Sequence, residues 1–259
     1  MSSIKDHLFD MQEERRDEWI EMNYPEAEEG TPEWDAAAQE YNWFRDWMEE
    51  AAEQHYFEAS LASIPDRLNE AKEVLCELER FLETEQPDIV LRMIFAHSVT
   101  VLDSFLMYSA RALLNHPPHM RSFLDKANLL VRNKDERNNL LSSKWIEKEP
   151  ESDTPEYIYI RRAQALVTRM PFQNHKAITR YFTNMLFTPY EWATEQLQVV
   201  IDTRNDLVHR NGVTPDHEQV YLWPERVKDT IRLVSSFIET AATTLLQEDA
   251  HFRSEDDTF

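Results

Sequence analysis

The chain has 259 residues, a formal net charge of −22 and an apolar content of 42%. It is long enough for one large domain or a domain with an added lobe, and apolar enough to exclude a disordered chain. Two glycines and long charged periodic stretches predict an all-α fold. The single cysteine excludes an internal disulfide framework and a cysteine-based zinc site.

Several functional classes are disfavoured by the motifs that the sequence lacks. It contains no glycine-rich phosphate loop, nucleophile elbow or metal-ligand spacing, so we expect no metal and no other cofactor. The N-terminus has no apolar signal region, and no apolar run reaches the length of a membrane span. We therefore expect a cytoplasmic protein with no membrane partner.

Residues 1–60 are predicted to form an acidic, tryptophan-rich helical segment. They contain 18 acidic and 4 basic residues, and four of the seven tryptophans, namely Trp19, Trp34, Trp43 and Trp47. The Thr31-Pro32 pair that follows a break in the pattern is typical of a helix start. Such large anchors indicate that the segment packs either on the rest of the chain or on a partner. Alternatively, it mimics RNA and covers a basic groove.

Residues 61–247 are predicted to form the main helical domain. A helix is expected at 64–83, and the helix that follows Pro87 is apolar on nearly all sides, so it should be the central core element. Cys76 and His97 lie within these two periodic stretches. We expect both side chains to be part of the core.

The second half of this domain alternates between polar connections and helices. The polar stretch 133–155 is predicted to be a loop, and helices are expected at 156–170 and 175–185. Pro224 is predicted to open a closing helix that runs to about 247. An acidic tail should follow at 248–259 and be frayed.

The chain is organised around one stretch, residues 188–212, which is predicted to be a single helix. Thr188 and Pro189 have the chemistry of a helix start, and Gly212 can take the left-handed conformation that ends a helix. Apolar residues recur between these ends at helical spacing and give the helix a face to bury, namely Leu197, Val200, Ile201 and Val208. The last two turns are densely polar.

Two side chains in these last turns have the chemistry needed to cut RNA. Arg204 lies beside the apolar face, where a guanidinium needs a partner because an unpaired buried charge is costly. His209 is flanked by Asn205 and Asp206 and lies at the end of the helix, where the dipole favours imidazolium. The imidazole would move a proton on or off the ribose 2′-OH or the 5′-leaving oxygen, while the guanidinium holds the phosphate.

The run Arg204-Asn205-Asp206-Leu207-Val208-His209 fits the R-x4-H signature of the HEPN superfamily (nucleotide-binding domains of higher eukaryotes and prokaryotes). The wider run RNDLVHRNG resembles bacterial HEPN ribonucleases of toxin–antitoxin and phage-defence systems. The resemblance covers roughly residues 65–247. It implies a HEPN-like helical bundle, with the acidic N-terminal segment added to it. It also implies that two copies pair so that both motifs form one metal-independent site.

Carried over by position, the resemblance makes Arg204 and His209 the expected catalytic pair and Asn205 the supporting polar residue. RNA cleavage in this family leaves a 2′,3′-cyclic phosphate and a 5′-OH. Family members often carry an acid on the central helix, so we suggest Asp103 as the partner of Arg204. Some family toxins have a tyrosine, two residues after the histidine, that a partner enzyme modifies, and Asn211 occupies that position here. The expected partners are an RNA substrate, a second copy of the chain, and an antitoxin or other regulatory protein.

Basic residues gather just before the motif helix in a chain that is otherwise acidic. Residues 161–190 contain five basic residues and no acidic residue. We expect Lys176 and Arg180, together with Arg210, to bind the phosphates of the substrate. The aromatic residues of this stretch either pack in the core or stack on unpaired bases.

A different interpretation of the motif stays open. Asp206 and Arg210 have the spacing of an ordinary ion pair on a helix surface, and Arg204 could simply neutralise a buried acid. The chain would then be a non-catalytic HEPN-like module for dimerisation, or for binding a nucleotide or a protein. The net charge of −22 favours this alternative. Burial of His209 in a closed core would favour it too.

Overall fold

The computed structural model describes residues 15–43, 45, 63–131, 133–141 and 155–256. The chain divides into two compact units, Met1–Ala59 and Ser60–Phe259. Within the described residues every regular element is a helix, and the only extended pairing is an isolated antiparallel bridge between Val213 and Gln219. The predicted all-α fold is confirmed.

The first unit contains two helical stretches, residues 15–23 and 32–43. The predicted helix start at Thr31 is confirmed, because its Oγ1 accepts a hydrogen bond from the Trp34 amide at 3.3 Å. Ile20 is fully buried in this unit. The rest of the predicted acidic segment lies outside the described residues.

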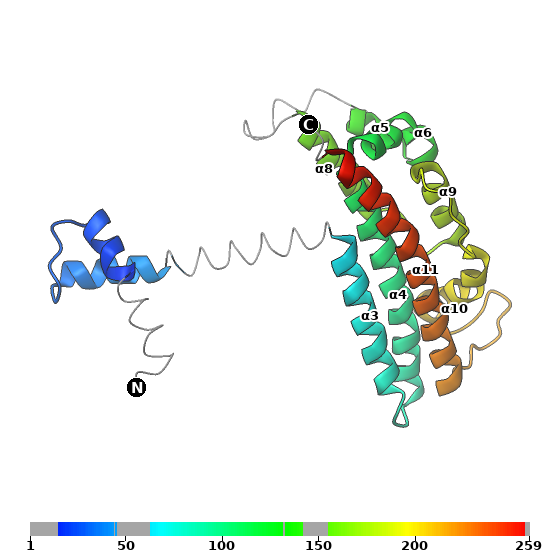
Figure 1. Cartoon of the computed structure of the whole chain (residues 1–259). Coiled ribbons are helices and arrows are strands. Elements are labelled where there is room, and N and C mark those ends of the chain that lie inside the picture. Colours follow the sequence, from blue (N-terminus) through cyan, green and yellow to red (C-terminus); the bar gives the residue numbers. More distant parts are fainter. Residues whose placement is uncertain (1–14, 44, 46–62, 132, 142–154, 257–259) are drawn as a thin grey trace. The chain divides into compact units, whose positions relative to one another are not determined.

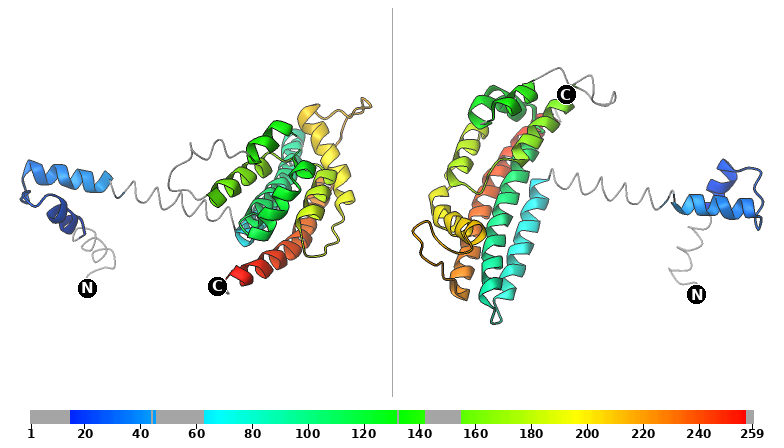
Figure 2. Two further views of the ribbon diagram at one scale, coloured as in Figure 1. Left: turned by 90° about the horizontal axis from the view of Figure 1, so that it is seen from above. Right: turned by 180° about the vertical axis from the view of Figure 1, so that it is seen from behind.

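Three long helices lie side by side in the second unit (Figures 1 and 2). They are α3 (Ile64–Phe81), α4 (Asp88–Leu113) and α11 (Pro224–Asp256). α4 packs against both of the others and also against α8 and α10, as its predicted central role requires. By length and composition α4 is also the one described helix that could cross a membrane, which is equally true of many buried core helices.

The remaining elements complete the bundle around α4 and α11. In chain order they are α5 (Pro117–Asp125), α6 (Ala127–Leu130), α7 (Lys134–Leu141), α8 (Pro155–Thr168), α9 (His175–Met185), the 3-10 turn η2 (Thr194–Gln196) and α10 (Leu197–His209). The Asn174 side chain caps α9 by accepting hydrogen bonds from the amides of Lys176 and Ala177. α10 packs on α4.

Several expectations from the sequence are wrong in detail. Part of the predicted loop at 133–155 is helix α7, and the stretch 142–154 lies outside the described residues. Cys76 and His97 are exposed rather than buried. Each residue is the direct neighbour of a core position in the sequence. Because one residue along a helix turns the side-chain direction by roughly 100°, such a neighbour can face solvent.

The motif helix starts nine residues later than predicted. Residues 186–193 form no regular element, η2 follows, and α10 begins only at Leu197. Trp192 in this connection is buried, and its indole N–H donates to Thr244 of α11 at 3.2 Å. The residues that were expected to form the first turns of the motif helix thus pack onto α11 without forming a helix.

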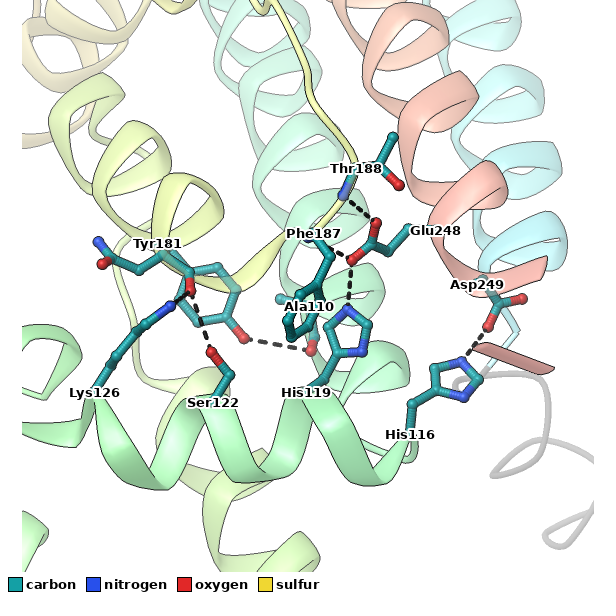
Figure 3. A network of polar contacts seen from close by, with 11 residues as sticks. Ala110, His116, His119, Ser122, Lys126, Tyr181, Phe187, Thr188, Glu248 and Asp249 are labelled. Carbon is teal, nitrogen blue, oxygen red and sulfur yellow. Dashed lines mark hydrogen bonds and ion pairs between the residues drawn. The ribbon is translucent and has the colours of Figure 1, made fainter. Parts of the chain in front are cut away.

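The end of α11 is held to α5 by two histidine–carboxylate pairs (Figure 3). His119 Nε2 lies 2.8 Å from Glu248 Oε1, and both side chains are fully buried. His116 Nε2 lies 2.8 Å from Asp249 Oδ1. The hydrogen bond from His116 contributes most to lowering the pKa of Asp249 below its usual range.

The predicted frayed tail from 248 onwards is therefore wrong for its first part. α11 continues to Asp256, and Glu248 also accepts hydrogen bonds from the amides of Phe187 and Thr188 at 2.8 and 2.7 Å. Burial alone would raise the pKa of Glu248, but the hydrogen bonds from His119 and from these amides lower it to about 2. These contacts of Glu248 and Asp249, called the clamp below, hold the acidic end of α11 against α5.

Candidate active site

The last two turns of α10 bring the three predicted catalytic residues together. Arg204 Nη1 lies 3.2 Å from Asn205 Oδ1 and 3.3 Å from His209 Nε2. Arg204 and Asn205 are half-buried, whereas His209 is exposed. The imidazole is therefore open to a ligand, and the guanidinium beside it is partly anchored in the protein.

The contact between Arg204 and His209 restricts how the two side chains can hydrogen-bond. Because an arginine nitrogen can only donate, a hydrogen bond between them requires Nε2 of His209 to accept, as it does in the tautomer that carries its proton on Nδ1. The lone pair of Nε2 faces Arg204 in this contact, so His209 can remove a proton through Nε2 only when the contact is broken, for example by a ligand that engages the guanidinium.

A tight turn ends α10 directly after His209. Asn211 and Gly212 both have left-handed backbone conformations, with φ of 53° and 82°. The amides of Arg210 and Gly212 both donate to the carbonyl of Asp206, which closes the helix. The predicted role of Gly212 in ending the helix is confirmed, although Asn211 shares it.

Arg92 of α4 supports this turn from the other side. Its Nη1 donates to the carbonyl of Asn211 at 3.4 Å, and a Cβ at Gly212 would lie only 3.1 Å from the same nitrogen. Gly212 is thus needed for the close approach as well as for its conformation. Sequence analysis missed Arg92, because nothing local connects positions 92 and 211.

Behind Arg204 lies Asp103, the acid suggested as its partner. Burial raises the pKa of the Asp103 carboxyl, while the hydrogen bond from Gln173 and the positive charge of Arg204 partly lower it again. Gln173 Nε2 donates to Asp103 Oδ2 at 3.1 Å. Arg204 is close enough for its charge to act on Asp103, but the suggested pairing is not observed, because Asp103 Oδ1 and Arg204 Nε are both buried without a hydrogen-bond partner. Gln173 is the residue that contacts Asp103, and the sequence did not reveal it.

The three predicted substrate-binding residues are not brought together in the same way. Arg210 forms an ion pair with the buried Asp206 at 2.5 Å, as the alternative interpretation of this i, i+4 pair anticipated. Lys176 and Arg180 are exposed and lie one turn apart on α9. Gln173 lies just before the start of α9, and its hydrogen bond to Asp103 connects this end of α9 to α4.

A cavity of about 230 Å³ lies between α9 and the end of α8, and both Arg169 and Arg180 line it. Phe172 and Tyr181 also line this cavity, and both are almost fully buried. Of the two alternatives for these aromatic residues, the core role is the one observed. Glu136 also lines the cavity and pairs with Arg169 at 3.6 Å, so the charge of one of the two arginines is offset there.

No protein-family model, curated protein or solved structure matches the chain. Within the described residues, no group of three or more histidine, cysteine or acidic side chains is placed to hold a metal ion. The chemistry of the site therefore has to be argued from its own side chains. These are an exposed imidazole, an adjacent guanidinium and a supporting amide, a set of groups that can bind a phosphate and transfer a proton.

Proposed function

We propose that the chain is a HEPN-like, metal-independent endoribonuclease that acts as a homodimer, in a toxin–antitoxin or antiviral defence setting. The observation that carries the proposal is the 3.3 Å contact between Arg204 Nη1 and the exposed His209 Nε2. A guanidinium binds phosphate oxygens with two parallel hydrogen bonds, and a neutral imidazole beside it is placed to act on the attached ribose.

In the proposed reaction the ribose 2′-oxygen attacks the adjacent phosphorus and the bond from phosphorus to the 5′-oxygen breaks. His209 accepts the proton of the 2′-OH, and Arg204 stabilises the charge that grows on the phosphate oxygens. A second imidazole has to protonate the 5′-oxygen, and in a twofold dimer His209 of the second copy can do so. The products are a 2′,3′-cyclic phosphate and a 5′-OH.

Exposed apolar residues near the motif support pairing of two copies. Val208 adjoins His209 and is 48% exposed, so its predicted place on the buried face of the motif helix is wrong. Ile89 and Met93, on either side of Arg92 in the sequence, are 62% and 64% exposed. Trp223, after the turn, is 53% exposed. A second copy that covered these apolar side chains would gain hydrophobic stabilisation, which supports the proposed pairing.

The direct test is incubation of the pure protein with mixed tRNA and mRNA in EDTA, with analysis of the fragment ends. We expect cleavage that leaves cyclic phosphates, and its loss in His209→Ala and Arg204→Ala proteins that remain folded. Val199→Ala is a matched control, because Val199 is an exposed residue in the first turn of the same helix. RNA cleavage by a His209→Ala protein that is free of other nucleases would contradict the proposed function.

The second candidate is a non-catalytic HEPN-like module for dimerisation or for binding a nucleotide or a protein. The ion pair of Arg210 with Asp206 favours it, since this arginine is then occupied within the helix. The assay repeated on a protein that lacks residues 1–60 distinguishes two causes of a missing activity. If this stretch, which carries 18 of the 49 acidic residues, repels RNA, its removal should allow cleavage. If the site itself is inactive, its removal should change nothing. The described core cluster of the second unit lies within residues 64–245.

A further inference from the structure

The stretch that follows the turn after His209 presents two aromatic side chains to solvent. Tyr221 is 67% exposed and Trp223 is 53% exposed, whereas Val220 beside them is buried in the core. Leu222, between the two aromatic residues, is half-buried and packs against the core. This alternation is that of an extended chain, in which residues two apart lie on the same side. Tyr221 and Trp223 therefore share one outward face and are called the aromatic pair below.

The aromatic pair is held close to the candidate active site. The amide of Val220 donates to the carbonyl of Gly212 at 2.8 Å, and Gly212 belongs to the turn that ends α10. Because consecutive Cα atoms are about 3.8 Å apart, this bond keeps the Cα atoms of His209 and Tyr221 within roughly 22 Å of each other. An RNA strand whose phosphate lies at Arg204 can therefore reach the aromatic pair within a few nucleotides.

Both side chains of the aromatic pair are held in place by their own chain. Arg226, in the first turn of α11, donates from Nη1 to the carbonyl of Tyr221 at 2.7 Å, and its guanidinium carbon lies 5.5 Å from the centre of the Trp223 ring. A cation in this position is attracted by the face of the ring. Tyr221 also donates from its hydroxyl to Gln219 Oε1 at 3.3 Å. A ligand that stacks on side chains already held in this way loses less conformational freedom on binding.

The spacing of the aromatic pair suits the flat bases of a nucleic acid. Residues two apart in an extended chain are separated by roughly 6.6 Å, and neighbouring bases are about 3.4 Å apart, so one base has room between the two side chains. Asp216 and Glu218 are exposed in the loop just before the pair, and their negative charges disfavour phosphates there. Affinity at this face therefore has to come from stacking on the bases.

We propose that Tyr221 and Trp223 bind unpaired bases of an RNA strand by stacking. The inference rests on the proposed ribonuclease function, because the same strand would place a phosphate at Arg204. It assigns single-stranded RNA as the substrate class, since the bases of a duplex are stacked on one another and do not offer their faces to a protein. Every base has such a face, so the aromatic pair tolerates different sequences.

Fluorescence anisotropy of labelled 2′-O-methyl RNA with the full-length protein tests the proposal. A methylated 2′-oxygen cannot attack the phosphorus, so binding is measured without cleavage. The probes are a single strand of about ten nucleotides, the same strand in a duplex, and an abasic strand of equal length. We expect the intact single strand to bind at least about tenfold more tightly than either of the other two probes.

Two matched double substitutions separate the rings from the rest of the side chains. Tyr221→Leu/Trp223→Leu keeps apolar side chains but removes both rings, so it should weaken binding of the single strand by about tenfold or more and leave the abasic strand unaffected. Tyr221→Phe/Trp223→Phe keeps a ring at each position and should retain most of the binding. Trp43→Leu, at an exposed tryptophan of the first unit, should change nothing. Circular dichroism should show that all variants are folded.

Absence of single-strand binding by the wild type overturns the proposal, as does equal binding by the double leucine variant. Conversion of a dimer to a monomer by the double leucine substitution, seen in analytical ultracentrifugation, would assign the aromatic pair to the contact between copies and overturn the proposal too. Cleavage of unmodified RNA is measured separately. Binding that depends on the aromatic pair, without such cleavage, would support the stacking site and contradict the ribonuclease function, so the two proposals fail in different ways.

Discussion

Nη1 of Arg204 lies 3.3 Å from Nε2 of His209, on the exposed end of α10. The two side chains are therefore neighbours before any substrate binds, and a phosphate that engages the guanidinium is delivered to the imidazole. When His209 gains a proton it can no longer accept from Arg204, and two positive charges then face each other. Proton transfer to His209 and tight phosphate binding by Arg204 are thus expected to accompany each other.

This relationship predicts that Arg204→Lys is not a conservative change. A lysine keeps the positive charge but has no planar fork to hold Asn205, His209 and a phosphate together. We expect the single-turnover cleavage rate to fall by about a hundredfold or more, with little change in thermal stability because the site is only half-buried. Wild-type rates in the Arg204→Lys protein would contradict the assigned role of Arg204.

Asp103 offers a test that separates positioning from stability. Burial raises the pKa of its carboxyl, so the ionised form destabilises the folded state as pH rises through that value. Asp103→Asn removes the charge that faces Arg204 and can still accept from Gln173. We expect unchanged or higher thermal stability at neutral pH together with slower RNA cleavage. A fall in stability with unaltered cleavage would make Asp103 a purely structural residue.

The pairing of two copies predicts different effects for two valines of α10. Val208 and Val199 are both exposed, but they lie nine residues apart and so on opposite faces of the helix. Val208→Glu places a charge beside His209 and should give a monomer in analytical ultracentrifugation and little cleavage. Val199→Glu should change neither property. Equal effects of the two substitutions would argue against an interface at the motif.

Much of the fold could be predicted from local signals. The period of α9 gave both of its bounds, proline gave the start of α11 but not its end at Asp256, and apolarity on nearly all sides identified α4 as the core helix. The group Arg204, Asn205 and His209 was predicted from the R-x4-H signature. Helix spacing alone does not place positions 204 and 209 on one face, since five residues turn the helix by roughly 140°, and their contact depends on the reach of the long Arg204 side chain.

The features that could not be predicted depend on contacts between distant positions. Thr188 has the composition of a helix cap, but its amide is bound by Glu248, 60 residues later, and the helix starts elsewhere. Glu248 itself lies in an acidic run that indicates a solvated tail, yet it meets His119, 129 residues earlier. Arg92 and Asn211 are 119 residues apart. No local pattern marks such pairs.

The turn after His209 predicts that Gly212→Ala is destabilising. An alanine at a φ of 82° costs about 1–2 kcal/mol, and its Cβ would also press on the end of Arg92. Chemical denaturation should show a loss of this size, with a smaller loss when Arg92 is already replaced by Gln. An additive double-variant cycle would show that only the backbone conformation matters.

The clamp between α5 and α11 predicts how stability depends on pH. The pKa of Glu248 is lowered from its usual 4.5 to about 2, so its contribution is present above the unfolded pKa and is lost as pH falls towards 2. A shift of this size corresponds to about 3 kcal/mol, and Glu248→Gln should lower the unfolding free energy at neutral pH by a similar amount. The side-chain NH2 of the glutamine is also a donor, whereas the backbone N–H groups of Phe187 and Thr188 both need an acceptor.

Denaturant unfolding measured between pH 6 and pH 2 checks this prediction. The wild-type protein should lose stability steeply below about pH 4.5, whereas the Glu248→Gln protein should start lower and change less over the same range. Glu239→Gln, an exposed position of the same helix that pairs with Lys72, should follow the wild-type curve. Parallel curves for wild type and Glu248→Gln would mean that other groups, such as Asp249 beside His116, dominate acid unfolding.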